Sequence, residues 1–250
     1  MNYIKISYEC IDTLLNFIFP RNIYCILCGR PIDRDEEYSI CHKCKLKLKF
    51  IGGKTCNKCG KPINDLYIDE ICHECISNLH FFTKAISCIE YDDLSKKIIY
   101  DLKYNKKRYI AYHIAEIIYD RLVDEKINSI DMIIPVPLHP AKERARSFNQ
   151  VNIIGRHLSR MANIDLDNKT LIRSKHTITQ NKLTKEERRK NLEDAFKVAK
   201  RNGIINKNIL IIDDIYTTGA TINQCSRVLI ENGAQNIYAA TFATGRNDCW

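Results

Sequence analysis

From residue 84 onward, apolar residues recur with two periods, one typical of buried strands and the other of amphipathic helices. The apolar runs Ile130–Val136 and Ile209–Ile212 predict strands that are buried on both faces. Helical spacing of apolar residues predicts helices over Leu94–Leu102, over Ile110–Val123 and from Ile222 onward. Because strands alternate with helices, we expect an α/β domain with a mostly parallel, doubly wound sheet that has helices on both faces.

Further elements extend this pattern on both sides of the two runs. Ala85–Tyr91 and Asn236–Ala243 are predicted strands, Leu171–Arg173 is a short one, and Val151–Met161 is a helix with one apolar face. Residues 174–193, in contrast, form a long polar stretch. Loops of this length are uncommon unless they have a function, so we expect this stretch to act at a site.

The first twenty residues predict a short amphipathic helix that packs on the rest of the protein. Asp12 and Asn16 interrupt its apolar residues and no small-residue cleavage site follows, which differs from a signal peptide. No apolar run in the chain approaches the roughly 20 residues of a membrane span. We therefore expect a cytoplasmic protein.

Cysteine spacing in residues 21–80 predicts a double zinc ribbon. Eight of the twelve cysteines form four C-x-x-C pairs, and the unit C-x-x-C-G-[KR]-P-I…I-C-H-x-C occurs twice. Such spacing is typical of two tetrahedral, structural Zn²⁺ sites with four thiolates each, whereas export-type disulfides and a redox pair fit it less well. Sequential pairing within each unit is favoured, and a cross-braced arrangement stays open. The ligands are Cys25, Cys28, Cys41 and Cys44 in the first unit, and Cys56, Cys59, Cys72 and Cys75 in the second.

The formal charge of +9 raises the question of a nucleic-acid partner. Eight thiolates on two Zn²⁺ ions would lower the charge to about +5. Basic clusters are consistent with a solvated face, with nucleic-acid binding or, for some of the cations, with a diphosphate ligand. These clusters are Lys96, Lys97, Lys103, Lys106, Lys107 and Arg108; Lys142, Arg144 and Arg146; and Lys182, Lys185, Arg188, Arg189 and Lys190.

The strongest indication of chemistry lies where the strand Ile209–Ile212 ends in two acids. Asp213 and Asp214 follow the strand directly, at the edge where open α/β sheets bind ligands. The segment Thr217–Thr221 then precedes a helix, so its N–H groups and hydroxyls are placed to bind an anion at a helix N-terminus. Acids beside an anion loop imply a ligand with a phosphate at one end and hydroxyls or bound Mg²⁺ at the other, such as ribose 5-phosphate.

Two other interpretations of this stretch are weaker. A strand that ends in acids is also found in P-loop ATPases, but Gly52-Gly53-Lys54-Thr55 lacks the first glycine of that motif because position 48 is leucine. A connector without a ligand has little need for three threonines and a glycine among five residues.

The stretch resembles the phosphoribosyl-diphosphate (PRPP) signature of type I phosphoribosyltransferases. Four further features, in order, are the zinc ribbons, Pro-Val-Pro-Leu-His-Pro at residues 135–140, Arg-x-Phe-Asn-Gln at 146–150, and a Thr-x-x-Gln…Arg-x-x-Asn pattern. Together with that signature they resemble the ComF competence family over about residues 15–245. The resemblance implies a phosphoribosyltransferase-like domain over 84–250 and a role in the uptake of transforming DNA. Ser147 is a departure, since the family usually has glycine there.

The resemblance also implies roles for individual residues. The acid pair holds the ribose hydroxyls directly or through Mg²⁺, and the threonine loop holds the 5-phosphate. Arg144 and Arg146 neutralise the diphosphate, and the stretch 174–193 closes over the site as a hood. The predicted ligand residues are Asp213, Asp214, Thr217, Thr218, Gly219, Ala220, Thr221, Arg144, Arg146, Gln180 and Arg188, with His139 and His176 as bases by location only.

Three functions stay open at this point. The first is a PRPP-binding protein of the DNA-uptake machinery, with single-stranded DNA and competence proteins as partners. The second is a metabolic phosphoribosyltransferase with a nucleobase-like acceptor. The third is a PRPP sensor without catalysis.

Overall fold

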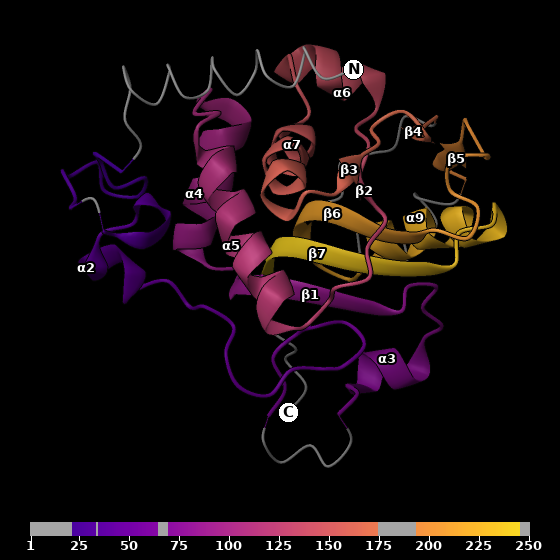
Figure 1. Ribbon diagram of the computed structural model, residues 1–250. Helices are drawn as coiled ribbons and strands as arrows, with labels where there is room; N and C mark the ends of the chain where they lie inside the picture. Colours follow the sequence, from indigo (N-terminus) through magenta and orange to yellow (C-terminus); the bar gives the residue numbers. More distant parts are fainter. Residues whose placement is uncertain (1–21, 34, 65–69, 175–193, 246–250) are drawn as a thin grey trace. The chain divides into compact units, whose positions relative to one another are not determined.

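The computed structural model describes residues 22–33, 35–64, 70–174 and 194–245 (Figure 1). The chain forms two compact units, Met1–Lys47 and Leu48–Trp250. The first described residues of the first unit belong to the first zinc ribbon, and the predicted helix at 1–20 lies outside the described residues. The second unit holds the second ribbon and the α/β domain. No helix in the described part of the chain is both long and apolar enough to span a bilayer.

The core of the second unit is a five-stranded sheet in the order β1-β7-β6-β2-β3, and all neighbouring strands are parallel. Its strands are β1 (Lys84–Glu90), β2 (Met132–Pro135), β3 (Asp165–Leu166), β6 (Asn208–Tyr216) and β7 (Asn236–Thr244). The central strands β6 and β7 are almost entirely buried, which explains why they are nearly continuous apolar runs in the sequence. The predicted parallel α/β fold is confirmed.

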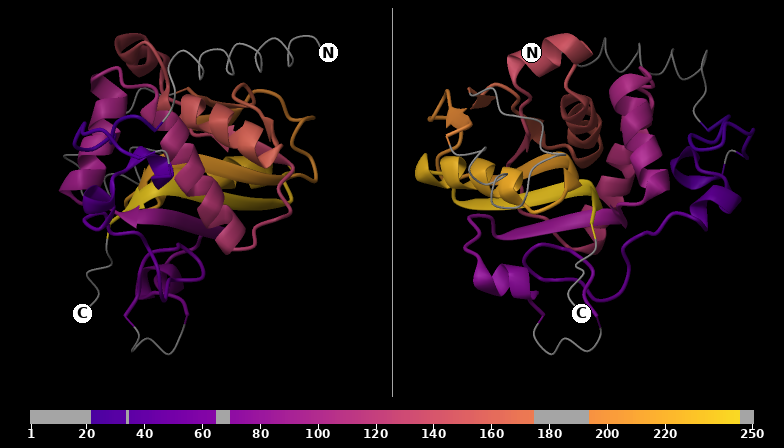
Figure 2. Two further views of the ribbon diagram at one scale, coloured as in Figure 1. Left: turned by 60° about the vertical axis from the view of Figure 1, so that its left-hand side comes forward. Right: turned by 180° about the vertical axis from the view of Figure 1, so that it is seen from behind.

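Helices cover both faces of this sheet (Figure 2). On one face α5 (Ile110–Asp124) packs beside α7 (Gln150–Ala162), and α4 (Asp93–Tyr104) contacts α5. The opposite face is covered by α9 (Ala220–Glu231), which contacts β6 and β7. A short helix, α6 (Pro140–Arg146), follows β2.

Side chains of β6 alternate between these two faces. Ile209 and Ile211 share a buried cluster with Leu229 of α9. Ile212 points the other way, since a Cβ on Gly155 of α7 would lie 2.9 Å from its Cδ1. Residues that follow along the same strand therefore alternate between the α9 side and the α7 side.

A second, two-stranded sheet pairs β4 (Leu171–Arg173) with β5 (Phe196–Val198) in antiparallel register. The sequence predicts β4 but not β5, which is only three residues long and follows the polar stretch. Phe196 is buried in the same cluster as α9.

The two zinc ribbons share one local backbone pattern. In the first, Gly29 N–H donates to Cys25 O at 2.8 Å, and the equivalent Gly60 N–H donates to Cys56 O at the same distance. A short helix follows the third cysteine of each unit, α2 (His42–Lys45) in the first ribbon and α3 (His73–Ser77) in the second. The first ribbon also contains the 3-10 turn η1 (Glu37–Ser39).

The second ribbon is part of the core of the α/β domain. Cys56, Cys59 and Cys72 belong to one buried cluster with Phe82 and with Tyr216 at the end of β6. Backbone bonding continues this packing, because Ala85 N–H of β1 donates to Lys58 O at 2.8 Å. The ribbon and the sheet therefore share one hydrophobic cluster, although the sequence predicts a domain boundary between residues 80 and 84.

Candidate functional site

Asp213 and Asp214 lie near the carboxyl end of β6 and point to opposite faces of the sheet. Asp214 is 6% exposed and contacts groups from α4 and α7, whereas Asp213 lies near Cys225 of α9. The backbone joins the two acids, since Asp214 N–H donates to Asp213 Oδ1 at 2.8 Å. Asp214 therefore faces the layer of α4 and α7, and Asp213 faces the layer of α9.

Asp213 is unusual in its protonation. Burial, and next the nearby charge of Asp214, raise the pKa of Asp213 from 3.8 to about 7. Lys103 and Arg173 oppose this shift only partly. A carboxyl group that titrates near neutral pH in this way is typical of a site that receives a cation or a polar ligand.

Asp214 is compensated by two side chains that donate to one of its oxygens. Lys103 Nζ of α4 lies 2.5 Å from Asp214 Oδ2, and Gln150 Nε2 of α7 donates to the same atom at 2.7 Å. Arg146 Nη1 in turn donates to Gln150 Oε1 at 2.5 Å. A chain of donors thus runs from α6 through α7 to the acid.

The loop between β6 and α9 has the geometry of an uncapped helix start. Gly219 is the N-cap of α9, with a φ of 74° and no side-chain cap, and Thr218 Oγ1 accepts a long bond from Ala220 N–H at 3.4 Å. A Cβ at position 219 would lie 2.2 Å from the hydroxyl oxygen of Tyr216, so glycine is required on two grounds. Thr217 is exposed and Thr221 lies in the first turn of α9.

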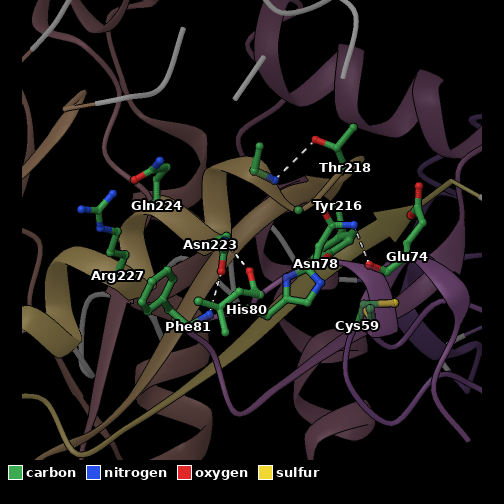
Figure 3. Close-up of a pocket in the computed structure, with 14 residues that line it drawn as sticks. Cys59, Glu74, Asn78, His80, Phe81, Tyr216, Thr218, Asn223, Gln224 and Arg227 are labelled. Carbon is green, nitrogen blue, oxygen red and sulfur yellow. Dashed lines mark hydrogen bonds between the residues drawn. The ribbon is translucent and has the colours of Figure 1, made fainter. Parts of the chain in front are cut away.

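A pocket of about 610 Å³ extends from this loop along α9 towards the second ribbon (Figure 3). Thr218, Gly219 and Ala220 line one end, and residues 78–81 line the ribbon side. Asn223 ties the two sides together, because its Oδ1 accepts from Phe81 N–H at 2.8 Å and its Nδ2 donates to Leu79 O at 3.2 Å. The loop between β6 and α9 therefore opens into a pocket with both polar and apolar walls.

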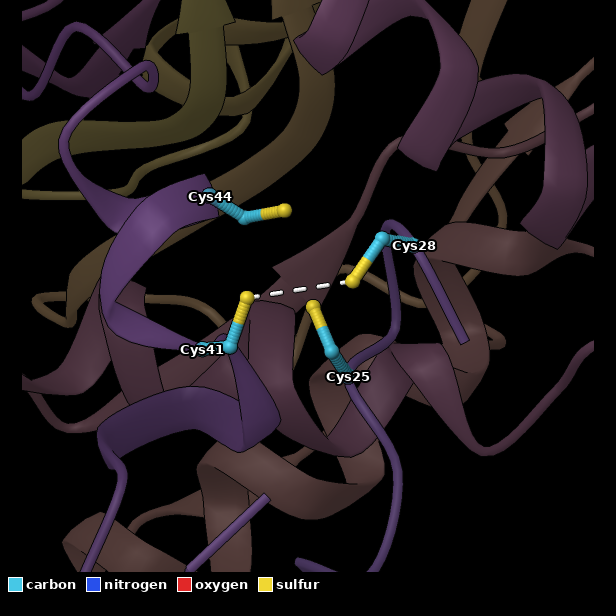
Figure 4. Close-up of side chains that lie close together, drawn as sticks. All are labelled: Cys25, Cys28, Cys41 and Cys44. Carbon is cyan, nitrogen blue, oxygen red and sulfur yellow. Dashed lines mark hydrogen bonds between the residues drawn. The ribbon is translucent and has the colours of Figure 1, made fainter. Parts of the chain in front are cut away.

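The eight predicted zinc ligands form two separate clusters, one in each ribbon. Cys25, Cys28, Cys41 and Cys44 converge in the first (Figure 4), and Cys56, Cys59, Cys72 and Cys75 converge in the second. Within each cluster all Sγ atoms lie within 4.8 Å of one another. The pairing is thus sequential, and the cross-braced alternative is excluded by these positions.

The spacing of the sulfur atoms fits zinc. Four thiolates about 2.3 Å from a tetrahedral Zn²⁺ lie roughly 3.8 Å apart. The Sγ atoms of Cys28 and Cys41 are 3.8 Å apart, and those of Cys59 and Cys72 are 3.7 Å apart. Cys72 N–H also donates to Cys56 Sγ at 3.3 Å, as a backbone amide does to a ligating thiolate. The geometry therefore fits two four-cysteine zinc sites without an open position.

Comparison with known proteins agrees with this architecture. A family model described as a double zinc ribbon domain matches residues 14–76. Competence protein F of Haemophilus influenzae is 32% identical over 145 residues, which cover 56% of this chain and 63% of that protein. Competence protein ComFC of Bacillus subtilis is 26% identical over 227 residues, which cover 84% of this chain and 90% of that protein.

The chain is a homologue of the ComF competence proteins. Among solved structures, a purine phosphoribosyltransferase from Pyrococcus horikoshii has a TM-score of 0.36 and 16% identity, with 56% of this chain and 85% of that chain covered. The fold is a mainly parallel α/β domain with helices on both faces of the sheet and with N-terminal four-cysteine ribbons, as the sequence predicts.

One departure from the ComF pattern has a structural explanation. Ser147 ends α6 with a φ of 68°, in the left-handed region that glycine adopts without strain. A glycine, which the resemblance to the ComF family leads us to expect at this position, would make the turn from α6 to Asn149 without strain. That turn is further fixed by Asn149 Nδ2, which donates to Val136 O at 3.0 Å.

The two arginines that the sequence predicts to bind diphosphate lie in different surroundings. Arg146 lies 5.1 Å above the ring of Tyr104 and bonds Gln150, while Arg144 is exposed. Sequence reasoning missed Arg173 of β4, whose pKa is lowered by burial and which interacts with Asp213. Burial, and then Arg173 and Arg146, also lower the pKa of Lys142.

The other predicted site residues are of two kinds. His139 caps α6, because its Nδ1 accepts from Ala141 N–H at 3.2 Å, and this role is structural. Gln180, Arg188 and His176, with the predicted hood, lie outside the described residues.

Proposed function

We propose that this chain binds PRPP or ribose 5-phosphate, the former with Mg²⁺, where β6 meets α9. The observation that carries the proposal is the juxtaposition, within a few residues, of the acid pair, of which Asp214 is buried, and the uncapped start of α9 at Gly219. In this assignment the loop 217–221 receives the 5-phosphate through backbone amides and the helix N-terminus. Asp213 and Asp214 receive the ribose hydroxyls.

The positive groups near the acid pair support a diphosphate at the other end of the ligand. Lys103 and Arg173 interact electrostatically with Asp213, and Lys142 interacts in turn with Arg173 and Arg146. Mg²⁺, when bound with PRPP, would neutralise part of the diphosphate charge. Carboxylate oxygens are among the ligands that Mg²⁺ prefers. The cations of the chain would hold the diphosphate in place and stabilise negative charge that grows on it as it leaves.

The homologues support a role in competence for this site. We propose that the protein acts in DNA uptake, with proteins of the competence machinery as partners. We place it in the cytoplasm, where a reducing environment suits cysteines that form no disulfide among the described residues. A metabolic phosphoribosyltransferase and a PRPP sensor without turnover are the alternatives. If diphosphate is released only when a nucleobase is present, the metabolic phosphoribosyltransferase is favoured. If PRPP binds without turnover, the sensor is favoured.

Thermal stabilisation by ligand tests the proposed site. PRPP with Mg²⁺ is expected to raise the melting temperature of the wild type by the equivalent of about 2.7 kcal/mol at a hundredfold excess over its Kd. Asp213→Asn/Asp214→Asn should abolish this increase, since both carboxylates are lost with little change in shape. Asp124→Asn, on an exposed acid at the end of α5, is the matched control. No increase for the wild type would remove the site assignment.

A second candidate activity, binding of single-stranded DNA, is favoured by an aromatic and basic surface at the end of α4. Tyr100, Tyr104 and Tyr109 are 54%, 58% and 57% exposed. The rings of Tyr100 and Tyr104 lie 4.9 Å apart, and Arg146 lies over the second of them. Exposed aromatic rings among cations are typical of surfaces on which bases stack while the backbone is neutralised. The exposed cations around them include Lys96, Lys97, Lys106, Arg108 and Arg144.

Stacking and charge are separable in a binding experiment. Tyr100→Ala/Tyr104→Ala is expected to weaken binding of a single-stranded oligonucleotide by about 1–3 kcal/mol per lost stack, with little change in salt dependence. Lys96→Ala/Lys97→Ala should instead lower the salt slope. Fluorescence anisotropy over a salt series measures both. Tyr24→Ala, on a residue 61% exposed in the first ribbon, is the comparison; an effect there but not on α4 would assign DNA binding to that ribbon.

A further inference from the structure

Lys103 reaches the acid pair from an element that is distant in the sequence. Its Nζ lies 2.5 Å from Asp214 Oδ2, and the side chains of Lys103 and Asp214 are only 17% and 9% exposed. A lysine and an aspartate in this setting form a largely desolvated ion pair, which persists only where its geometry is well supported. The contact is therefore a built feature of the site and not a surface salt bridge.

The end of α4 fixes the position of this lysine. The helix begins with a capping box in which Asp92 accepts from Leu94 and Ser95 N–H groups. Near its other end Asp101 binds Lys107 at 2.8 Å. Leu102, directly before Lys103, is fully buried. These contacts hold the backbone of the helix end in place, and so they fix the point from which the Lys103 side chain extends.

The two oxygens of Asp214 are consequently in different situations. Oδ2 receives both Lys103 Nζ and Gln150 Nε2. Among the described residues, Oδ1 forms no hydrogen bond or ion pair of its own. Gln150 is itself oriented by Arg146, so the carboxylate plane is held by two donors from two helices. One oxygen is thus compensated by two donors, and the other keeps its capacity to accept a hydrogen bond.

The proposed ligand explains what this arrangement does. Two adjacent carboxylates repel each other, and a bound divalent cation is one way to offset that repulsion. The ammonium group of Lys103 offsets it with a group of the chain itself. A carboxylate that is already compensated and oriented can accept a hydroxyl hydrogen bond without further reorganisation.

We infer that Lys103 is a positioning residue of the ribose-phosphate site, which neutralises Asp214 so that the sugar end of the ligand binds without a divalent cation. Mg²⁺ is then required for the diphosphate of PRPP and not for the ribose hydroxyls. This inference rests on the proposed function. It adds that the lysine serves the ribose end of the ligand and that the metal serves the diphosphate.

Ribose 5-phosphate, which has no diphosphate, separates these two requirements. Isothermal titration calorimetry in magnesium-free and magnesium-containing buffer should give the wild type the same affinity for ribose 5-phosphate, whereas PRPP should bind tightly only with Mg²⁺. Lys103→Met should weaken ribose 5-phosphate binding without Mg²⁺ by about tenfold or more. Added Mg²⁺ should restore part of that loss, and Lys103→Arg should retain most of the wild-type affinity.

Controls keep folding and binding apart. Lys96→Met, on an exposed residue of the same helix, removes the same charge without touching the pair. Lys103→Met/Asp214→Asn leaves no uncompensated charge, so it should regain stability without regaining affinity.

The outcomes separate the inference from the proposed site. Binding of ribose 5-phosphate by the wild type that depends on Mg²⁺, or unchanged Mg²⁺-free binding by Lys103→Met, would overturn the inference while leaving the site in place. Absence of binding of either ligand by the wild type would overturn the site and the inference together.

Discussion

Cys59→Ser is expected to unfold more of this protein than Cys28→Ser, although the two cysteines are equivalent in the repeat. Cys59 is 2% exposed and shares a buried cluster with Phe82, Tyr216 and strands of the sheet. Cys28 is exposed and belongs to the separate first unit. Loss of the second zinc site therefore disrupts part of the α/β core that the zinc ligands hold together, whereas loss of the first site does not.

The expected size of this effect follows from the energetics of structural zinc. Binding of zinc contributes about 10–16 kcal/mol to the folding of small zinc-finger peptides. If only about 3 kcal/mol of this is lost from the second unit, its melting temperature falls by roughly 6–12 °C for a domain of this size. Cys28→Ser should leave that transition within about 1–2 °C of the wild type. Both variants should lose one zinc ion per chain.

Hydrogen exchange locates the loss. In Cys59→Ser, peptides from β1 and β6 should exchange faster, because Tyr216 at the end of β6 lies in the same cluster as Cys59. In Cys28→Ser, faster exchange should be limited to residues before 48. Equal protection of the sheet in the two variants, with zinc lost from each, would show that the second ribbon does not stabilise the sheet.

Much of this fold follows from patterns that are local in the sequence. Strands β6 and β7 are largely buried on both faces, so each contains a long apolar run that can be recognised in the sequence without knowledge of its neighbours. The zinc ligands are equally local, because each set of four lies within about 20 residues and closes on itself. Sequence alone therefore predicts four of the five strands of the sheet, its parallel character and both metal sites, but not β3, which is two residues long.

What the sequence does not predict depends on contacts between distant elements. Lys103 belongs to a run of lysines and carries no local indication that it, among them, meets Asp214 of β6. Arg173 likewise reaches Asp213 from a strand of only three residues, which is paired outside the main sheet. In both cases the tertiary arrangement of helices and strands decides which of several similar cations enters the site.

The repeat of the ribbons conceals a further difference of this kind. The two units have the same spacing and the same turn, and no sequence feature shows that the second is built into the sheet. The surroundings of the glycine after the second cysteine of each unit show the packing of the second ribbon against the sheet. Gly29 and Gly60 have φ values of 71° and 69°, yet a Cβ on Gly29 would meet nothing within 4 Å. A Cβ on Gly60 would lie 2.4 Å from Ala85 O and 2.8 Å from Ile86 Cα of β1.

Gly60→Ala and Gly29→Ala form a matched pair that measures this packing directly. Both alanines adopt a left-handed conformation, which costs about 1–2 kcal/mol in either ribbon. Gly60→Ala has in addition a collision with backbone atoms of β1, which a rotamer change cannot relieve. The ribbon must move away from the strand, and the bond from Ala85 N–H to Lys58 O is then strained or lost. We expect a total loss of about 4 kcal/mol or more, within the range that marks a specific structural cause.

Denaturant unfolding followed by circular dichroism should show this loss as an early transition of the α/β domain in Gly60→Ala. In Gly29→Ala that transition should keep its midpoint, because the strain is confined to the first unit. Zinc content, measured in parallel, should stay at two ions per chain in Gly29→Ala. Since the two substitutions share backbone geometry and differ only in what surrounds the new methyl group, equal midpoints would mean that the contact between the second ribbon and β1 contributes nothing to stability.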